Sequence, residues 1–135
     1  MTKEVTKDIN QIIEECENKH GELGEDFALV QVKNGKDKVL FGFKSPDLGR
    51  TKLYKDKLAN EFSKASLGGK NKAQDLGLFN INKSYVETCL ILDDENLGDY
   101  KKWQEVTQLA PRAIDDALSA IEELVEQTSV IIKKN

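Results

Sequence analysis

The sequence is poor in the residues that carry most acid–base, nucleophilic and metal chemistry. Its 135 residues include one histidine, His20, and two cysteines, Cys16 and Cys89. A structural zinc site needs about four such ligands, which these three cannot supply without carboxylates. A catalytic dyad would have to combine His20 with a distant partner, and no nucleophile motif marks one. We therefore expect a non-enzymatic protein without metal or cofactor, with His20 a surface cation at a helix end.

Long apolar runs are also absent. No stretch approaches the roughly 20 apolar residues of a membrane-spanning helix, and the polar start, Met1 to Val5, is not followed by an apolar signal segment. Both cysteines fall within apolar patterns, which favours reduced, buried thiols. These features predict a cytoplasmic protein that does not enter a membrane.

Arginine is scarce, with two residues against 18 lysines, and the basic charge is unevenly distributed. Residues 33–72 carry eleven basic and four acidic side chains, whereas residues 1–32 and 73–135 are both acidic. Such a basic centre between acidic ends favours association with a charged partner. Nucleic acid is disfavoured, because the basic segment offers Tyr54 and a single arginine, Arg50, for stacking and base contacts, and the chain is acidic overall with a pI near 5.1.

The first third of the chain predicts a helix followed by a hairpin. Apolar residues at helical spacing indicate a helix over residues 2–20, capped by Thr2 and ended by Gly21. Two apolar runs, 27–32 and 39–43, then flank Asn34-Gly35, the preferred pair for a two-residue hairpin turn. This turn pairs Val30 with Val39, Ala28 with Phe41 and Phe27 with Gly42. Both faces of the hairpin are apolar, so both need cover from helices or a second subunit.

The rest of the chain predicts a helix, a second hairpin and a long helix. Tyr54, Leu58, Phe62 and Ala65 mark the helix, which Gly68-Gly69 ends. Residues 76–82 and 85–92 are typical of two strands. A broad apolar stripe over residues 99–133, starting at the N-cap Asp99, contains Pro111, where we expect a kink or a break.

The predicted fold is a single α+β domain over residues 1–135, in the order α-β-β-α-β-β-α. It has three helices and an antiparallel sheet of four to five strands, formed by two hairpins. In element order alone this is similar to small dimeric secretion chaperones and roadblock-type domains.

Two groups of residues are candidate binding surfaces. The first could hold an anion at a helix start or in a basic loop, and comprises Arg50, Thr51, Lys52, Lys55, Lys70 and Lys72. The second is a stripe of small and apolar residues on the last helix that could pack in the core or form a homodimer interface. It comprises Trp103, Ala110, Ala113, Ala117 and Leu124.

The acidic segment Asp93 to Asp99 shares one feature with calcium-binding loops. Glycine stands at its sixth position, as in calcium loops, but Leu97 occupies the fifth and Gln104 the twelfth. Carboxylates that stabilise the start of a helix explain the segment more simply. A metal-dependent enzyme is the weakest of the three function classes.

The sequence thus predicts a cytoplasmic binding protein, such as an adaptor, a chaperone-like protein or an inhibitor. It would act as a homodimer and recognise another protein or macromolecule. The alternative is a small-molecule binding protein that sequesters or senses a phosphorylated ligand, such as a nucleotide, through the basic central segment.

Overall fold

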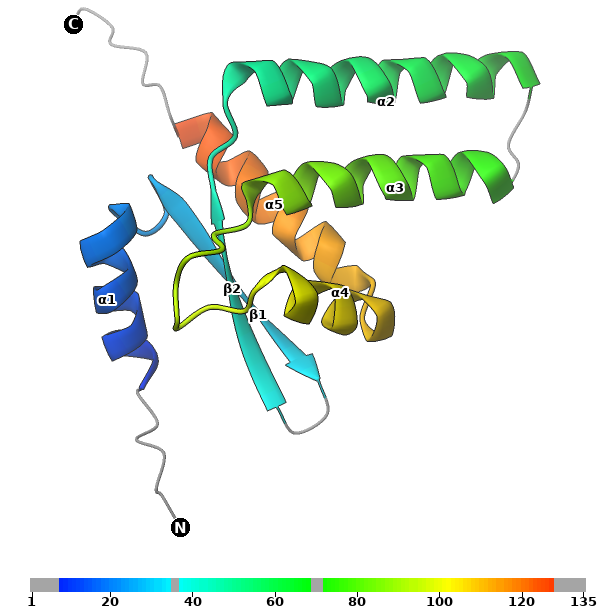
Figure 1. Cartoon of the computed structure of the whole chain (residues 1–135). Helices are drawn as coiled ribbons and strands as arrows, with labels where there is room; N and C mark the ends of the chain where they lie inside the picture. Colours follow the sequence, from blue (N-terminus) through cyan, green and yellow to red (C-terminus); the bar gives the residue numbers. More distant parts are fainter. Residues whose placement is uncertain (1–7, 35–36, 69–71, 128–135) are drawn as a thin grey trace, which may run out of the picture.

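The computed structural model describes residues 8–34, 37–68 and 72–127. In chain order its elements are helix α1 (Ile9–His20), strands β1 (Phe27–Asn34) and β2 (Asp37–Lys44), and helices α2 (Leu48–Gly68), α3 (Lys72–Cys89), α4 (Tyr100–Leu109) and α5 (Arg112–Gln127). The strands form one antiparallel hairpin, with α1 on one face and α3, α4 and α5 on the other (Figure 1). The chain is a helix-rich α+β protein.

The predicted second hairpin is wrong. The described residues form five helices and two strands, not three helices and four to five strands. One face of α3 carries partly or fully buried side chains at spacings of three and four residues: Leu78, Ile81, Tyr85 and Cys89. That spacing is helical, so residues 76–89 belong to one helix rather than to two strands. The element order that resembled secretion chaperones and roadblock-type domains is therefore not observed.

The end of the predicted last strand does run beside the sheet. The Ile91 amide donates a hydrogen bond to the Gly42 carbonyl at 2.8 Å, and the Gly98 amide donates one to the Leu40 carbonyl at 2.8 Å. Residues 90–98 therefore cover the outer edge of β2, whose backbone groups would otherwise lack partners.

The first hairpin is confirmed, but its predicted register is wrong by two residues. Val39 pairs with Val32 rather than Val30, and the ladder continues to Asn34 opposite Asp37. The connecting residues are therefore 35–36, which lie outside the described part. A shift of two residues leaves every side chain on its predicted face. The observed register sets large residues against small ones, with Phe43 opposite Ala28 and Leu29 opposite Gly42.

Both faces of the hairpin are covered within the chain, as their apolar character predicts. On one face Phe41 and Phe43 pack edge-on against Trp103 of α4, with ring centroids 5.0 and 5.5 Å apart, and α3 and α5 complete the cluster. On the other face Phe27 packs with Cys16 of α1 and with the 90–98 segment. No helix in the described ranges is long and apolar enough to cross a membrane.

The predicted helix end at Gly21 and the predicted break at Pro111 are confirmed, whereas the predicted cap Thr2 lies outside the described residues. Helix α1 ends at His20, and Gly21 follows with a φ of 109° that favours glycine. The predicted long helix breaks into α4 and α5 beside Pro111. The predicted cap Thr2 lies among the residues that are not described, and Asp8 caps α1 instead.

Candidate functional site

Helices α2 and α3 lie side by side and antiparallel, and they extend from the sheet as a helical hairpin that we call the α2–α3 arm (Figure 1). Among the side chains whose burial is described, none in α2 is buried. In α3 the buried ones are Tyr85, Val86 and Cys89, near its C-terminal end. The arm therefore joins the body at its base.

A pair of stacked tyrosines holds the two helices of the arm together. The rings of Tyr54 and Tyr85 lie 4.0 Å apart between centroids and are inclined by 8°, and the Tyr54 hydroxyl donates a hydrogen bond to Asn82 at 2.7 Å. Burial, with a smaller contribution from Glu122, raises the pKa of Tyr54 to about 12. Burial also raises the pKa of Tyr85. Both hydroxyls stay protonated near neutral pH, so the pair is a neutral packing element.

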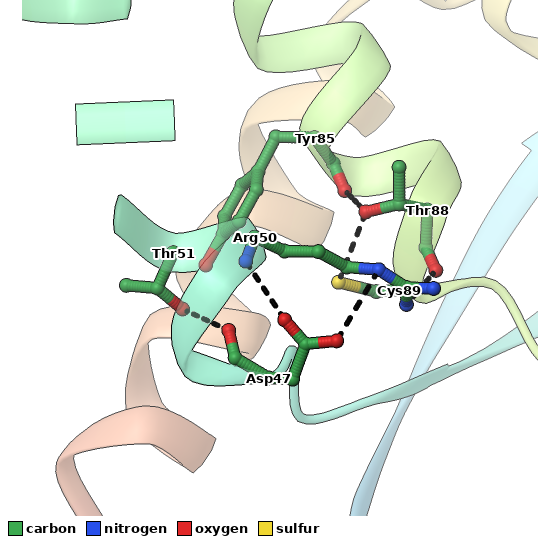
Figure 2. Close-up of polar contacts among 6 residues, drawn as sticks. All are labelled: Asp47, Arg50, Thr51, Tyr85, Thr88 and Cys89. Atoms are coloured by element: carbon green, nitrogen blue, oxygen red, sulfur yellow. Dashed lines mark hydrogen bonds and ion pairs between the residues drawn. The ribbon is translucent and has the colours of Figure 1, made fainter. Parts of the chain in front are cut away.

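Arg50 connects the start of α2 with the end of α3, as Figure 2 shows. Its Nη1 atom donates a hydrogen bond to the Thr88 carbonyl at 3.2 Å, and its Nε atom lies 3.7 Å from the Asp47 carboxylate. Asp47 also accepts a hydrogen bond from the Arg50 amide at 2.7 Å and so acts as the N-cap of α2. A carboxylate of the chain itself therefore already occupies this helix start.

The structure does not bring the six predicted anion-binding residues together. The Thr51 hydroxyl donates to the Asp47 carbonyl at 3.0 Å, and the Lys52 ammonium pairs with Asp56 at 3.0 Å. Lys55 faces a depression between α2 and α5. Lys70 lies outside the described residues, and Lys72 is the first residue of α3. Arg50 lies in the first turn of α2, whereas Lys72 follows the other end of that helix, which is roughly 30 Å long at 1.5 Å per residue.

Two depressions flank the tyrosine stack. One, of about 80 Å³, lies in the groove between α2 and α3. The other, of about 220 Å³, lies between α2 and α5 and includes Lys55 and Glu122. Both are smaller than the roughly 300–1,000 Å³ of typical small-molecule pockets. Their size fits a side chain better than a nucleotide.

Large apolar side chains are exposed along the arm. Leu53 and Phe62 of α2 are 56% and 60% exposed, and Phe79 of α3 is 38% exposed. The sequence pattern placed Phe62 on the apolar stripe of its helix and did not predict that these three side chains are exposed. The fold covers Tyr54 of that stripe with Tyr85 but leaves Phe62 largely in solvent.

The residues predicted as a homodimer interface lie mostly inside the chain. Trp103, Ala113, Ala117 and Leu124 are buried in the core, and Ala110 is partly buried against it. The homodimer stays a prediction. A second subunit is not needed to cover the hairpin, because one chain covers both of its faces.

His20 is not the surface cation that the sequence suggested. Its side chain is 9% exposed, and its Nε2 atom lies 2.8 Å from the fully buried Asp94 carboxylate. The Cys16 thiol donates to the same carboxylate at 3.7 Å. Burial first, then the nearby Asp94 charge, raises the pKa of Cys16 to about 11, and burial raises the pKa of Cys89. Both thiols are protonated and poor nucleophiles at neutral pH.

The acidic segment 93–99 has structural tasks. Asp99 caps α4 by accepting a hydrogen bond from the Lys102 amide at 2.8 Å, as predicted. A depression of about 370 Å³ opens over this helix start, but its Lys102 pairs with Glu105 at 3.9 Å, so its charges are balanced. Within the described ranges no three His, Cys, Asp or Glu side chains are grouped to hold a metal ion.

Comparison of the chain with models of protein families, with curated proteins and with solved structures gave no match.

Proposed function

We propose that the chain is a non-enzymatic cytoplasmic binding protein that recognises another protein through the α2–α3 arm. One observation carries this proposal: a 21-residue helix stands out from the body with no buried side chain among those described. Packing against the body is what normally stabilises a helix of a globular protein. A surface that keeps Leu53 and Phe62 in solvent is typical of a protein-interaction site.

The charge of the arm supports the same proposal. Residues 48–89 carry eight basic and four acidic side chains, a net charge of +4. The rest of the chain carries twelve basic and twenty acidic side chains, a net charge of −8, and the two sum to the −4 of the whole. A basic arm on an acidic body orients an encounter with an acidic partner. A homodimer, in which the arm of one copy meets the acidic body of another, is one form of this association.

The phosphorylated-ligand alternative has less support. The cation best placed for a phosphate, Arg50, already contacts Asp47 and the Thr88 carbonyl, and the adjacent groove measures about 80 Å³. A nucleotide would need a larger pocket with several convergent donors.

Photo-crosslinking tests the proposal. A benzoylphenylalanine is placed in living cells at Phe62 on the arm or, as a control, at Leu109 on α4, which is 74% exposed. We expect a discrete crosslinked protein from position 62 and none from position 109. A homodimer would give a species at twice the 15.2 kDa chain mass. The proposal fails if neither position gives a crosslink, or if both positions give the same products.

A further inference from the structure

The groove between α2 and α3 has the size of one aliphatic side chain. Leu53, Ile81 and Tyr85 give it apolar walls, and its volume is about 80 Å³. Typical small-molecule pockets are larger, at roughly 300–1,000 Å³. This volume suits a leucine, isoleucine or valine side chain better than a nucleotide.

Two cations stand on the α2 side of this apolar groove. Arg50 and Lys57 are seven residues apart, so they lie on the same face of α2 about two turns apart, on either side of Leu53. Within the described part of the chain, Lys57 has no ion-pair partner. Arg50 already contacts Asp47 and the Thr88 carbonyl, so Lys57 is the cation left for a partner. An apolar hollow beside such a cation is complementary to an aliphatic side chain with a carboxylate near it.

We propose that this groove binds an acidic protein segment by taking up one of its aliphatic side chains, while a neighbouring Asp or Glu residue of the segment pairs with Lys57. This inference rests on the proposed function and names the partner chemistry of the arm. A protein segment is favoured over nucleic acid because the groove is lined mainly by apolar atoms and because the body, with its net charge of −8, repels a polyphosphate.

Synthetic peptides provide the test, with fluorescence anisotropy as the measurement. The probes are short peptides with a central leucine between glutamates, the same peptides with a central alanine, and peptides with the leucine between lysines. A single-stranded DNA oligonucleotide is the fourth probe. We expect the acidic leucine peptide to bind about tenfold more tightly than the alanine version, because only leucine fills the groove.

Variants of the groove separate its shape from its charge. Ser84 is exposed and lines the groove, so Ser84→Trp should fill it and abolish the leucine preference, whereas Ser84→Ala should retain it. Lys57→Glu should weaken binding of the acidic peptide about tenfold and favour the lysine-flanked one. Lys52→Glu changes the net charge equally on the same helix, but Lys52 pairs with Asp56 away from the groove. It should leave the peptide ranking intact. Thermal melting of every variant confirms that each one folds.

Three results would overturn the inference: equal binding of leucine and alanine peptides, an unchanged preference in Ser84→Trp, or tighter binding of the DNA. A lack of binding to all peptides would overturn it too. The crosslink at Phe62 is independent of the groove. A discrete crosslink with no peptide preference therefore removes this inference and leaves the proposed function standing.

Discussion

The Nε2 atom of His20 lies 2.8 Å from Oδ2 of Asp94, and this contact joins the end of α1 to the loop after α3. The other oxygen of Asp94 accepts a hydrogen bond from the Asn96 amide at 2.9 Å and lies 3.9 Å from the Lys19 ammonium. The Asp94 side chain has no exposed surface. One buried carboxylate thus holds a helix against the loop that covers the sheet edge.

Replacing Asp94 should destabilise the protein strongly. Asp94→Ala removes the partner of a nearly buried histidine and of a backbone amide, so we expect a loss of about 3 kcal/mol in the free energy of unfolding, measured by urea denaturation. Asp93→Ala is the matched control, because Asp93 is the exposed neighbour and its removal should be nearly neutral. Equal effects of the two substitutions would contradict the structural role of Asp94.

Acid should remove this stabilisation. Burial by itself would raise the pKa of Asp94, but the Asn96 amide, His20 and Lys19 together hold that pKa below its ordinary value of 3.8. The unfolded chain therefore takes up the proton at a higher pH than the folded chain does. The stabilisation by the ionised Asp94 carboxylate is present above the ordinary pKa of 3.8, and it is lost as the pH falls through the lower pKa that Asp94 has in the folded chain. Urea denaturation of the wild type and of Asp94→Asn across this range measures it, and the wild-type advantage should shrink with acid. An advantage that is constant with pH would rule out the ionised carboxylate as its source.

Local sequence patterns predicted the helices and strands of this chain better than they predicted which elements pack together. The first hairpin, the stop at Gly21, the cap at Asp99 and the break at Pro111 depend on neighbouring residues, and the structure contains each of them. The prediction of two strands over the residues of α3 was wrong because their apolar residues fit both a helical and a strand period. Burial of Tyr85 and Val86 against distant elements favours the helix.

The candidate site likewise depends on packing between distant elements, which local patterns do not predict. The basic character of the arm was visible in the sequence, whereas its separation from the body was not. The partner of His20 is 74 residues away in Asp94, and no local pattern marks that pair. Whether Phe62 is packed or exposed likewise depends on where the other helices lie.

Gly42 should resist substitution because the loop after α3 crosses it closely. A Cβ atom at this position would lie 2.6 Å from Cδ1 of Leu97 and 3.0 Å from Cδ1 of Ile91. Both side chains are buried, so Gly42→Ala should cost about 1–3 kcal/mol by urea denaturation.

Gly49→Ala is the control for that substitution. Gly49 lies in the first turn of α2, and its nearest neighbour would be an Asp47 oxygen at 3.4 Å. Alanine should be neutral or stabilise the helix there by roughly 0.5–1 kcal/mol. If Gly42→Ala were as harmless as Gly49→Ala, the close crossing of the 90–98 segment over β2 would be wrong.

Two phenylalanines distinguish the body from the arm. Phe43 is fully buried against Trp103, whereas Phe62 is 60% exposed on α2. Phe43→Ala should lower the free energy of unfolding by about 3–5 kcal/mol, since it empties part of the core. Phe62→Ala should change it by no more than about 0.5 kcal/mol, as the arm does not depend on that ring for its fold. Urea denaturation of both variants measures the contrast. A large loss for Phe62→Ala would mean that the ring is packed in solution, and the arm would then lack the exposed apolar surface on which its binding role depends.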